Sequence, residues 1–199
     1  MEAIPHEPEY RYGTSAVFSV HQHLSVNIIP LRADETLPDD ARFDEEIPLP
    51  FRIAAETAHL DISSIRSLRN IGSAADDLMG FLRIQQQKID LVVNYILAQE
   101  DQPHLRHLTH SFSAGGFSYF ADTPPASGSI MRIKLFLSQP AAAVYAYGEV
   151  SEVSIEDGRP LVQIRFIRLR DKDQDLLIRA ALHEQQQQLK QRAELRVKD

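Results

Sequence analysis

Apolar positions between residues 68 and 96 recur at alternating spacings of three and four, which is the heptad pattern of a coiled-coil helix. The nine positions of this stripe are Leu68, Ile71, Ala75, Leu78, Leu82, Gln85, Ile89, Val92 and Ile96. Further apolar residues flank the stripe, with Val93 on one side and with Phe81 and Tyr95 on the other. The resulting face is wider than a two-stranded coiled coil buries. It predicts either a long helix that covers its own domain or self-association through the helix, and we favour self-association.

Two features of the stripe bear on the number of helices that associate. Ile71 and Val92 place β-branched residues at one of the two core positions, which favours three or four helices over two. Gln85 is the one polar residue of the nine, and a buried amide can fix the register and the oligomeric state of a bundle. We therefore expect an oligomerisation helix that extends over residues 62–99 and ends before Pro103.

On either side of this helical region the pattern changes to the alternation that is typical of β-strands. Residues 16–30 are rich in β-branched side chains and predict one or two strands before the helices. After Pro103 the chain shows a strand, a glycine turn and a strand in 105–120, and single strands in 129–138, 144–153 and 161–169. Short strands at this spacing predict a small barrel or sandwich, and residues 171–198 predict a final helix.

The stretch between the first strands and the helices is acidic. Between Leu31 and Pro50 lie seven carboxylates, two arginines and three prolines, and we interpret this stretch as an extended, solvated linker. A short helix, 51–60, is expected to begin after Pro50. The predicted plan is one unit with a strand segment (1–30), an acidic linker (31–50), a helical heptad region (51–102), a barrel (103–170) and a C-terminal helix (171–199).

Composition narrows the class of protein. The 199 residues are 43% hydrophobic and include no cysteine, which excludes disulfides, thiolate metal sites and thiol catalysis. No apolar run approaches the roughly 18 residues of a membrane span. Residues 1–10 lack the apolar region of a signal peptide, so we expect a cytoplasmic protein. The formal net charge of −7 argues against a nucleic acid polymer as the partner.

Two groups of polar residues could carry chemistry. His104, His107 and His110 are spaced three apart, which disperses them on a helix and divides them between the two faces of a strand, so we expect no metal site. Ser111 and Ser113 lie beside glycines, but no G-x-S-x-G elbow surrounds them. We interpret them as turn-forming serines of a protein that is not an enzyme.

A basic stripe marks the passage from the last predicted strand into the final helix. It consists of Arg165, Arg168, Arg170 and Lys172. Arg165 alternates with Ile164 and Phe166 and is therefore expected to face away from the core. The stripe is either a contact for an anion or a nucleotide, or an ordinary charged strand that pairs with the abundant carboxylates.

The succession of motifs from residue 111 onward resembles the PilZ domain family. The motifs are the hexapeptide SFSAGG at 111–116, Gly128 before an alternating strand, the tripeptide GEV at 148–150, and a strand that ends in Arg165 and Phe166. In that family an Asp/Asn-x-Ser-x-x-Gly turn precedes two hairpins, and Ser113 and Gly116 match its serine and glycine. The resemblance covers roughly residues 105–185. It implies an α+β fold: a small antiparallel six-stranded β-barrel with long heptad-repeat helices and a C-terminal helix.

The resemblance implies a role in bacterial cyclic di-GMP signalling, because PilZ domains are receptors for this second messenger. Two nucleotide-binding motifs of the family are incomplete here. Ser111 stands where an acidic or amide residue is expected, and the family's Arg-x-x-x-Arg is absent before the barrel and occurs only at Arg192 and Arg196. We therefore expect dinucleotide binding in the family's usual mode to be weak or lost. The alternative is a receptor with a rearranged site formed by Ser111, Ser113, Gly116 and Arg165.

These departures are similar to those of the atypical, tetramer-forming PilZ proteins, in which long heptad-bearing helices accompany the barrel. That resemblance implies a non-enzymatic homotetramer without a cofactor. It also implies that the protein acts through contact with an unidentified regulatory protein, in motility, pili or virulence.

Overall fold

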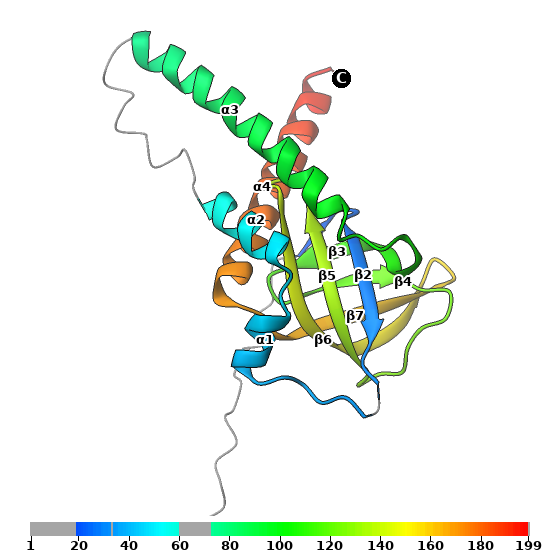
Figure 1. The fold of residues 1–199 in the computed structure, drawn as a ribbon. Helices are drawn as coiled ribbons and strands as arrows, with labels where there is room; N and C mark the ends of the chain where they lie inside the picture. Colours follow the sequence, from blue (N-terminus) through cyan, green and yellow to red (C-terminus); the bar gives the residue numbers. More distant parts are fainter. Residues whose placement is uncertain (1–18, 33, 60–72, 199) are drawn as a thin grey trace, which may run out of the picture.

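Six antiparallel strands close into a barrel in the computed structural model, which describes residues 19–32, 34–59 and 73–198 (Figure 1). The strands are β2 (Ser25–Pro30), β3 (Arg106–Ser113), β4 (Gly116–Phe120), β5 (Ile130–Leu137), β6 (Ala142–Glu156) and β7 (Arg159–Arg168). Around the barrel the order is β3-β2-β5-β6-β7-β4, and β4 pairs with β3 to close the ring. A two-residue strand, β1 (Val20–His21), pairs with β3 as well. The predicted α+β fold with a six-stranded antiparallel barrel is confirmed.

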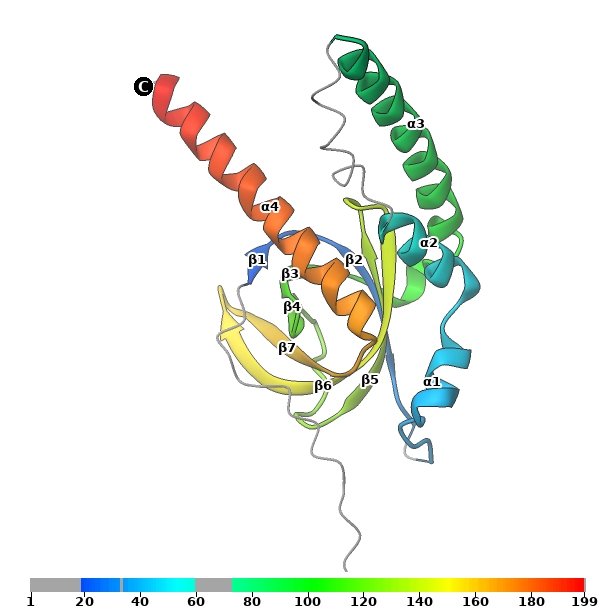
Figure 2. The same ribbon diagram turned by 90° about the vertical axis from the view of Figure 1, so that its left-hand side faces the viewer.

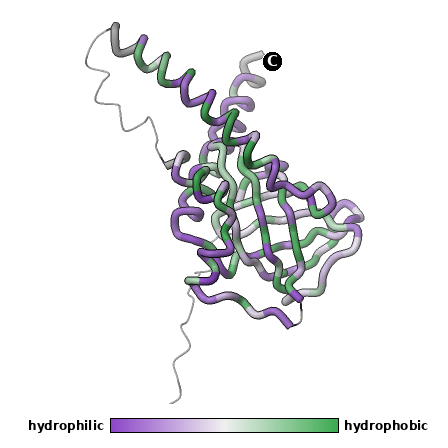
Figure 3. The backbone as a smooth tube through the Cα atoms, viewed as in Figure 1, coloured by the Kyte–Doolittle hydropathy of each residue, from purple (hydrophilic) through white to green (hydrophobic). Residues whose placement is uncertain are grey.

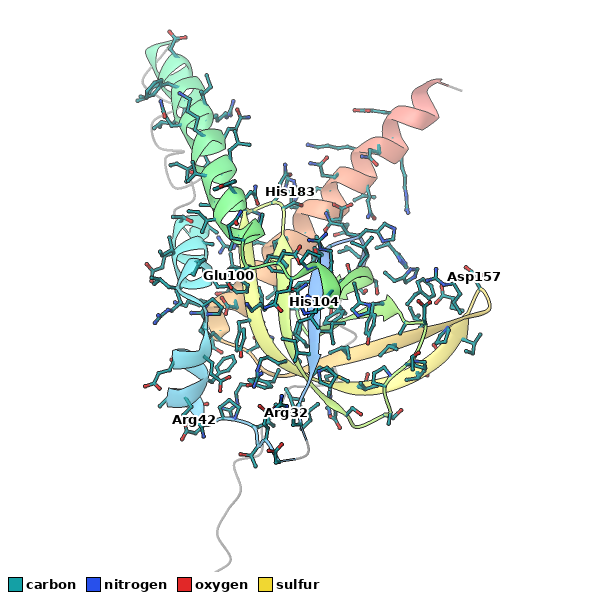
Figure 4. All side chains as sticks on the ribbon, turned by 45° about the vertical axis from the view of Figure 1, so that its right-hand side comes forward. Arg32, Arg42, Glu100, His104, Asp157 and His183 are labelled. Carbon is teal, nitrogen blue, oxygen red and sulfur yellow. The ribbon has the colours of Figure 1, made fainter. Side chains whose placement is uncertain are left out.

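The alternation of the sequence places the core inside the barrel. Along β5 every second side chain is buried, beginning with Met131 and continuing through Ile133 and Leu135 to Leu137. The turn between β6 and β7 is tight, and its residues Asp157 and Gly158 form the tip of the hairpin (Figure 4). Asp157 has φ 51° and Gly158 has φ 74°, which are the left-handed values that two-residue hairpin turns require.

Strand β2 joins the barrel although the helical region separates it from the other strands in sequence. It lies between β3 and β5, with Val26 opposite His107 on one side and opposite Leu135 on the other. The helices between β2 and β3 are therefore an excursion from a single barrel. Residues 16–18 of the predicted strand segment and residues 60–72 of the predicted helical region lie outside the described residues.

Within the described residues, four α-helices accompany the barrel and cover part of its surface (Figure 2). They are α1 (Asp40–Glu46), α2 (Leu49–His59), α3 (Ser73–Ala98) and α4 (Asp171–Lys198), and a short 3-10 helix, η2 (Pro103–Leu105), precedes β3. The first half of α4 adds Leu176, Leu177, Ala180 and Ala181 to the barrel core. Its second half extends away from the barrel (Figure 2). In the described part of the chain, no helix is long and apolar enough to cross a membrane.

A second apolar cluster lies on the outer side of β6. There Tyr145 and Tyr147 meet Phe43 of α1, Phe51 of α2 and buried side chains from the C-terminal end of α3. The expectation that residues 31–50 form an extended, solvated linker was wrong for its second half, where α1 packs on the barrel. Charge and prolines suggested the linker, but the apolar Phe43 and Ile47, four residues apart, supply a buried face.

Helix α3 is attached to the barrel at its C-terminal end and then projects away from it (Figure 1). Val93 and Leu97 are buried against the barrel. Just beyond the helix, the Asp101 carboxylate accepts hydrogen bonds from Asn27 Nδ2 at 2.8 Å and from Ser25 Oγ at 2.9 Å, and it pairs with Arg106 Nε at 2.9 Å. The Asn27 side chain also bonds to the backbone N–H and carbonyl of Gln102. These contacts fix the direction in which α3 leaves the barrel.

The ionised Asp101 carboxylate is expected to stabilise this joint. Burial opposes its ionisation, but hydrogen bonds from Arg106, Asn27 and Ser25 outweigh burial and hold its pKa below the ordinary value of 3.8. Asp101→Asn should lower the free energy of unfolding at pH 7 by about 1–3 kcal/mol. A lowered folded-state pKa means that this contribution is present above the unfolded-state pKa and is lost as the pH falls through the folded-state value.

Urea unfolding of the wild type and of Asp101→Asn at pH 7 and at about pH 3 measures the difference at both ends of this range. Asp157→Asn, at the exposed hairpin tip, serves as the matched control and should unfold like the wild type. If Asp101→Asn lowered the free energy of unfolding equally at both pH values, the ionised Asp101 carboxylate would not be the stabilising group.

Candidate functional site

The serine and the glycine of the hexapeptide 111–116 hold the turn between β3 and β4. The Ser113 hydroxyl accepts a hydrogen bond from the Gly115 backbone N–H and donates one to the Gly116 carbonyl, each at 3.2 Å. Ser113 is itself buried. The serine that sequence analysis assigned to a turn therefore forms one, and its hydroxyl is already occupied by the backbone of that turn.

Gly116 is required by the close approach of β4 to β7. A Cβ atom added at this position would lie 2.0 Å from the Ile164 carbonyl oxygen and 3.2 Å from the Arg165 Cα atom. The neighbouring Gly115 carbonyl accepts the Phe166 backbone N–H at 2.9 Å and continues the pairing beyond the strand. Gly116 thus closes the barrel at the β4–β7 seam, which is a sufficient reason for a glycine here.

A cavity of about 530 Å³ lies beside this turn, and its lining includes Ser111, Ser113, Gly116 and Arg165. The structure therefore brings together the four residues of the predicted site. A row of polar side chains crosses the lining at matching register, from His21 on β1 through Ser111 and Ser118 to Gln163 on β7. The Ser111 and Ser118 hydroxyl oxygens are 2.8 Å apart and share a hydrogen bond.

His21, Ser118 and Gln163 of this row were not among the site residues predicted from the sequence. They are separated by many residues in the chain, and only the strand register shows that they are neighbours. Alternation along each strand could have indicated that they face the same side, but it could not have indicated which strands pair.

Both signs of charge lie at the rim of the cavity. The Arg165 guanidinium, which is exposed, donates to a Glu149 carboxylate oxygen at 2.7 Å. His110 Nε2 is 3.6 Å from a Glu156 carboxylate oxygen, and the His110 ring stands edge-on to His21 at 4.8 Å between centroids. An anionic ligand would have to compete with Glu149 for Arg165. The Arg165 guanidinium can therefore bind a ligand in the cavity only after its ion pair with Glu149 breaks.

The remaining residues of the basic stripe do not reach the cavity. Arg168 pairs with Asp40 of α1. Arg170 forms a bidentate ion pair with the buried Asp173 carboxylate, in which Nε donates to Oδ2 at 2.6 Å and Nη2 donates to Oδ1 at 2.8 Å. Both arginines thus follow the second of the two interpretations, a charged strand end that pairs with carboxylates. Arg192 belongs to the half of α4 that extends away from the barrel, and the Arg196 side chain lies outside the described residues.

The three histidines near β3 lie in different environments. His104 belongs to η2, while His107 and His110 lie on β3. His107 packs on Tyr119 at 4.9 Å between centroids, and burial lowers its pKa against the opposing charge of Asp122. Among the residues that the structure describes, no group of three or more potential ligands is placed to hold a metal ion.

The heptad stripe lies mostly on an exposed side of α3. Leu78, Ile89, Val92 and Ile96 are exposed, whereas Leu82 and Gln85 are half-buried. Leu68 and Ile71 lie outside the described residues, and so does the Ala75 side chain. Hydrophobic residues continue along α3 after it leaves the barrel (Figure 3). Only Val93 and Leu97 of this helix are buried in the described part of the chain, so α3 does not simply cover its own domain.

A family model described as the PilZ domain matches residues 82–183, about half of the chain. No curated protein sequence matches the chain.

Several solved structures are similar to the chain at low identity. A Bacillus subtilis inhibitor of motility is 12% identical with a TM-score of 0.47, and the match covers 94% of this chain and 58% of that protein. A pathogenic protein from Xanthomonas campestris, described as a tetrameric PilZ domain self-assembled through a helical bundle, is 14% identical with a TM-score of 0.49. That match covers 88% of this chain and 91% of the Xanthomonas protein. The chain therefore spans less than two thirds of the Bacillus protein.

The packing role of Gly116 is testable without a ligand. Gly116→Ala should lower the free energy of unfolding by about 2 kcal/mol or more, because the new Cβ meets the backbone of β7 and a strand must shift. Gly80→Ala is the matched control, since nothing lies within 4 Å of a Cβ added there. Because Gly80 is inside α3, its replacement should stabilise the protein by up to about 1 kcal/mol. Chemical denaturation measures both, and a Gly116→Ala variant as stable as the wild type would show that the barrel does not need this glycine.

Proposed function

The chain belongs to the PilZ domain family, and we propose that it is a non-enzymatic regulatory protein of bacterial cyclic di-GMP signalling that assembles as a homotetramer through α3. In this proposal the assembled protein acts by contact with a regulatory protein partner in the cytoplasm, and dinucleotide binding in the family's usual mode is weak or lost. The exposed apolar surface of α3 is the observation that carries the proposal.

A helix of 26 residues that projects from a barrel would not normally leave large apolar side chains in water. On the heptad stripe the exposed fractions are 47% at Leu78, 45% at Ile89, 59% at Val92 and 43% at Ile96. Their spacing is that of a helix seam, and burying them against other copies of the same helix supplies the association energy. At the base of α3 the apolar surface continues, because Ile96 and Val93 line a groove with Leu49 and Ile53 of α2.

The contacts of the motif residues at the barrel site support the proposal that the chain does not bind the dinucleotide in the family's usual way. Ser113 and Gly116 are the two motif positions that match the family. Ser113 stabilises the β3–β4 turn, and Gly116 allows the close approach of β4 to β7. Ser111 offers a hydroxyl in place of a carboxylate or an amide and bonds to Ser118. The site thus keeps the residues that build the barrel and lacks those that the family uses to grip a nucleotide.

The same contacts argue for a binding protein and against an enzyme. The hydroxyls of Ser111 and Ser113 are engaged with Ser118 and with the turn backbone. A nucleophilic serine needs a base within hydrogen-bond reach of its hydroxyl. These serines instead form the contacts of a turn and a strand pair.

A second candidate function is a cyclic di-GMP receptor that uses a rearranged site. The cavity favours it, because about 530 Å³ is a typical size for a small-molecule pocket and Ser111, Ser113, Gly116 and Arg165 all line it. In this alternative the ligand displaces Glu149 from Arg165.

Titration calorimetry with cyclic di-GMP separates the two candidates. For the first we expect no binding at dissociation constants in the micromolar range or below. Micromolar or tighter binding that disappears in Arg165→Ala would reject the first candidate as stated and establish the second. Arg159→Ala, on the same strand but outside the cavity lining, is the matched control for a loss of positive charge.

The assembly is tested by charges placed in the heptad stripe. Leu82→Asp combined with Ile89→Asp should dissociate the oligomer, because assembly would bury two unpaired carboxylates at a cost on the order of 3 kcal/mol or more. Gln87→Asp combined with Asn94→Asp places the same charge on an exposed, polar part of α3 and should leave the oligomer intact. Sedimentation velocity measures the mass of each. Equal dissociation by both pairs would mean that charge alone, and not the stripe, decides the assembly.

A further inference from the structure

The hairpin of β6 and β7 extends past the end of β5, and its tip stands away from the rest of the barrel (Figure 4). Strand β5 pairs only with residues 142–149 of β6, and the loop before β5 adds backbone hydrogen bonds with Val150. Strand β7 accompanies β6 further, as far as the pair of Glu156 and Arg159. In the part of the chain that the structure describes, no other strand pairs with β6 beyond Val150, so one edge of the hairpin is open.

The register of the hairpin determines which backbone groups face this open edge. Because the turn has two residues, Glu156 and Arg159 at its ends form the first hydrogen-bonded pair of the ladder. Hydrogen-bonded and non-hydrogen-bonded pairs then alternate along an antiparallel ladder. The backbone N–H and C=O groups of Val153 and Ile155 therefore point away from β7 and toward the open edge.

Pro160 agrees with this alternation. It stands opposite Ile155 and has no backbone N–H to donate. Its carbonyl oxygen accepts the Ala121 backbone N–H at 3.1 Å, on the side of β7 that faces away from β6. Pro160 and Ile155 thus direct their backbone groups toward opposite edges of the hairpin. The chain that continues from β4 occupies the edge at Pro160, and the edge at Ile155 is the open one.

The side chains of the open edge alternate between two faces. Val153 packs partly against the barrel core, and Ile155 on the same face is 70% exposed. Glu152 and Glu156 lie on the opposite face, and both are exposed. The edge therefore offers backbone donors and acceptors together with an apolar side chain on one face and two carboxylates on the other.

The two carboxylates have different neighbours within the sheet. Glu156 stands opposite Arg159, and one of its oxygens is 3.6 Å from His110 Nε2. Glu152 stands opposite Gln163, which carries no charge. The face beside the open edge is therefore negative at Glu152, and the Glu156 side chain, 48% exposed, is accessible to a further cation.

Charge disfavours two occupants of the edge that the chain itself could supply. If two copies paired edge to edge in antiparallel fashion about Ser154, Glu152 of each copy would stand opposite Glu156 of the other. Like charges directly opposite each other destabilise a strand pair. Residues 1–18 carry three glutamates against one arginine, so they do not complement the edge either. A basic strand does complement it.

We infer that the open edge of β6 binds an extended, basic segment of the partner protein as an added strand. The backbone of this segment bonds to the N–H and C=O groups of Val153 and Ile155, which is the usual mode of strand addition. Its lysine or arginine side chains lie beside Glu152 and Glu156, and its apolar side chains, on the other face, cover Ile155. This inference rests on the proposed contact with a regulatory protein and gives the chemistry of the segment that makes the contact.

Fluorescence anisotropy with a labelled peptide measures this binding on the full chain. The probe is a short peptide with blocked ends in which lysine and valine alternate, because it has high strand propensity and places its charges on one face. We expect saturable binding of this peptide, and no binding of the matched peptide in which glutamate replaces lysine. Equal binding of both peptides would overturn the inference, because charge would then play no part.

Ile155→Pro tests the backbone of the edge. Proline removes the N–H that faces the peptide and leaves the hydrogen bonds between β6 and β7 in place. We expect peptide binding to weaken by about tenfold or more. Ile155→Thr is the matched control, because it keeps the N–H, and it should bind within about fivefold of the wild type. An Ile155→Pro variant that folds, as judged by circular dichroism, and binds like the wild type would overturn the inference.

A charge reversal keeps the test decisive if the proline variant fails to fold. Glu152→Lys combined with Glu156→Lys should weaken binding of the lysine–valine peptide by about tenfold or more. The matched control is Glu45→Lys combined with Glu56→Lys, which changes the net charge equally at exposed positions of α1 and α2 and should bind like the wild type. Equal weakening by both pairs would overturn the inference, because the net charge of the chain would then decide the binding.

Sedimentation velocity of the same variants separates this inference from the proposed assembly. Ile155→Pro should have the mass of the wild type, and a lower mass would overturn the inference by showing that the edge joins copies of the chain. A wild type that does not bind the lysine–valine peptide would also overturn it. Because the mass of the wild type is measured independently, that result would leave the proposed assembly through α3 standing.

Discussion

The first half of strand β6 (142–148) is buried on both of its faces, and the positions of the helices relative to the barrel depend on this double burial. Its inward side chains belong to the barrel core, while Tyr145 and Tyr147 point outward into the cluster formed with α1, α2 and the base of α3. Buried hydroxyls need partners, and Glu46 accepts from Tyr145 at 3.1 Å and from Tyr147 at 2.6 Å. Burial, and next the hydrogen bond to Glu46, raises the pKa of Tyr147, so its hydroxyl stays protonated and donates.

This cluster anchors the C-terminal turns of α3 on the barrel. Val93 and Leu97 anchor its last turns in the cluster, and the Asp101 contacts fix the chain as it returns to β3. Lys134 of β5 adds an ion pair with Glu100 at 2.9 Å, at the point where α3 meets the barrel (Figure 4). A helix held in one direction loses little further freedom when its exposed heptad stripe meets another copy, which favours the proposed assembly.

The sequence was sufficient to predict the barrel and the long helix, because both have strong periodic patterns. Alternation in β5 and the glycine turn after β3 placed the strands, and the three-four spacing placed α3. The sequence was misleading where local chemistry and tertiary packing disagree, as in the acidic stretch, where Phe43 anchors α1 beneath a highly charged surface. It was also insufficient for α3, because a helix with several apolar faces has a clear period and no indication of which face meets its own domain.

The candidate site, too, could be predicted from the sequence only in part. Its motif could be located from sequence, but only the strand register shows that Gly116 is fixed by the Ile164 backbone and that Arg165 already has a carboxylate partner. The glycine and the arginine of the site therefore already have partners within the barrel, while α3 carries apolar side chains that the described residues of the chain leave exposed. Light scattering of the wild-type chain at about 10–100 μM tests directly whether α3 assembles four chains. Assembly through α3 predicts a mass of four times the 22.5 kDa chain without added nucleotide, and a mass of 22.5 kDa would contradict it.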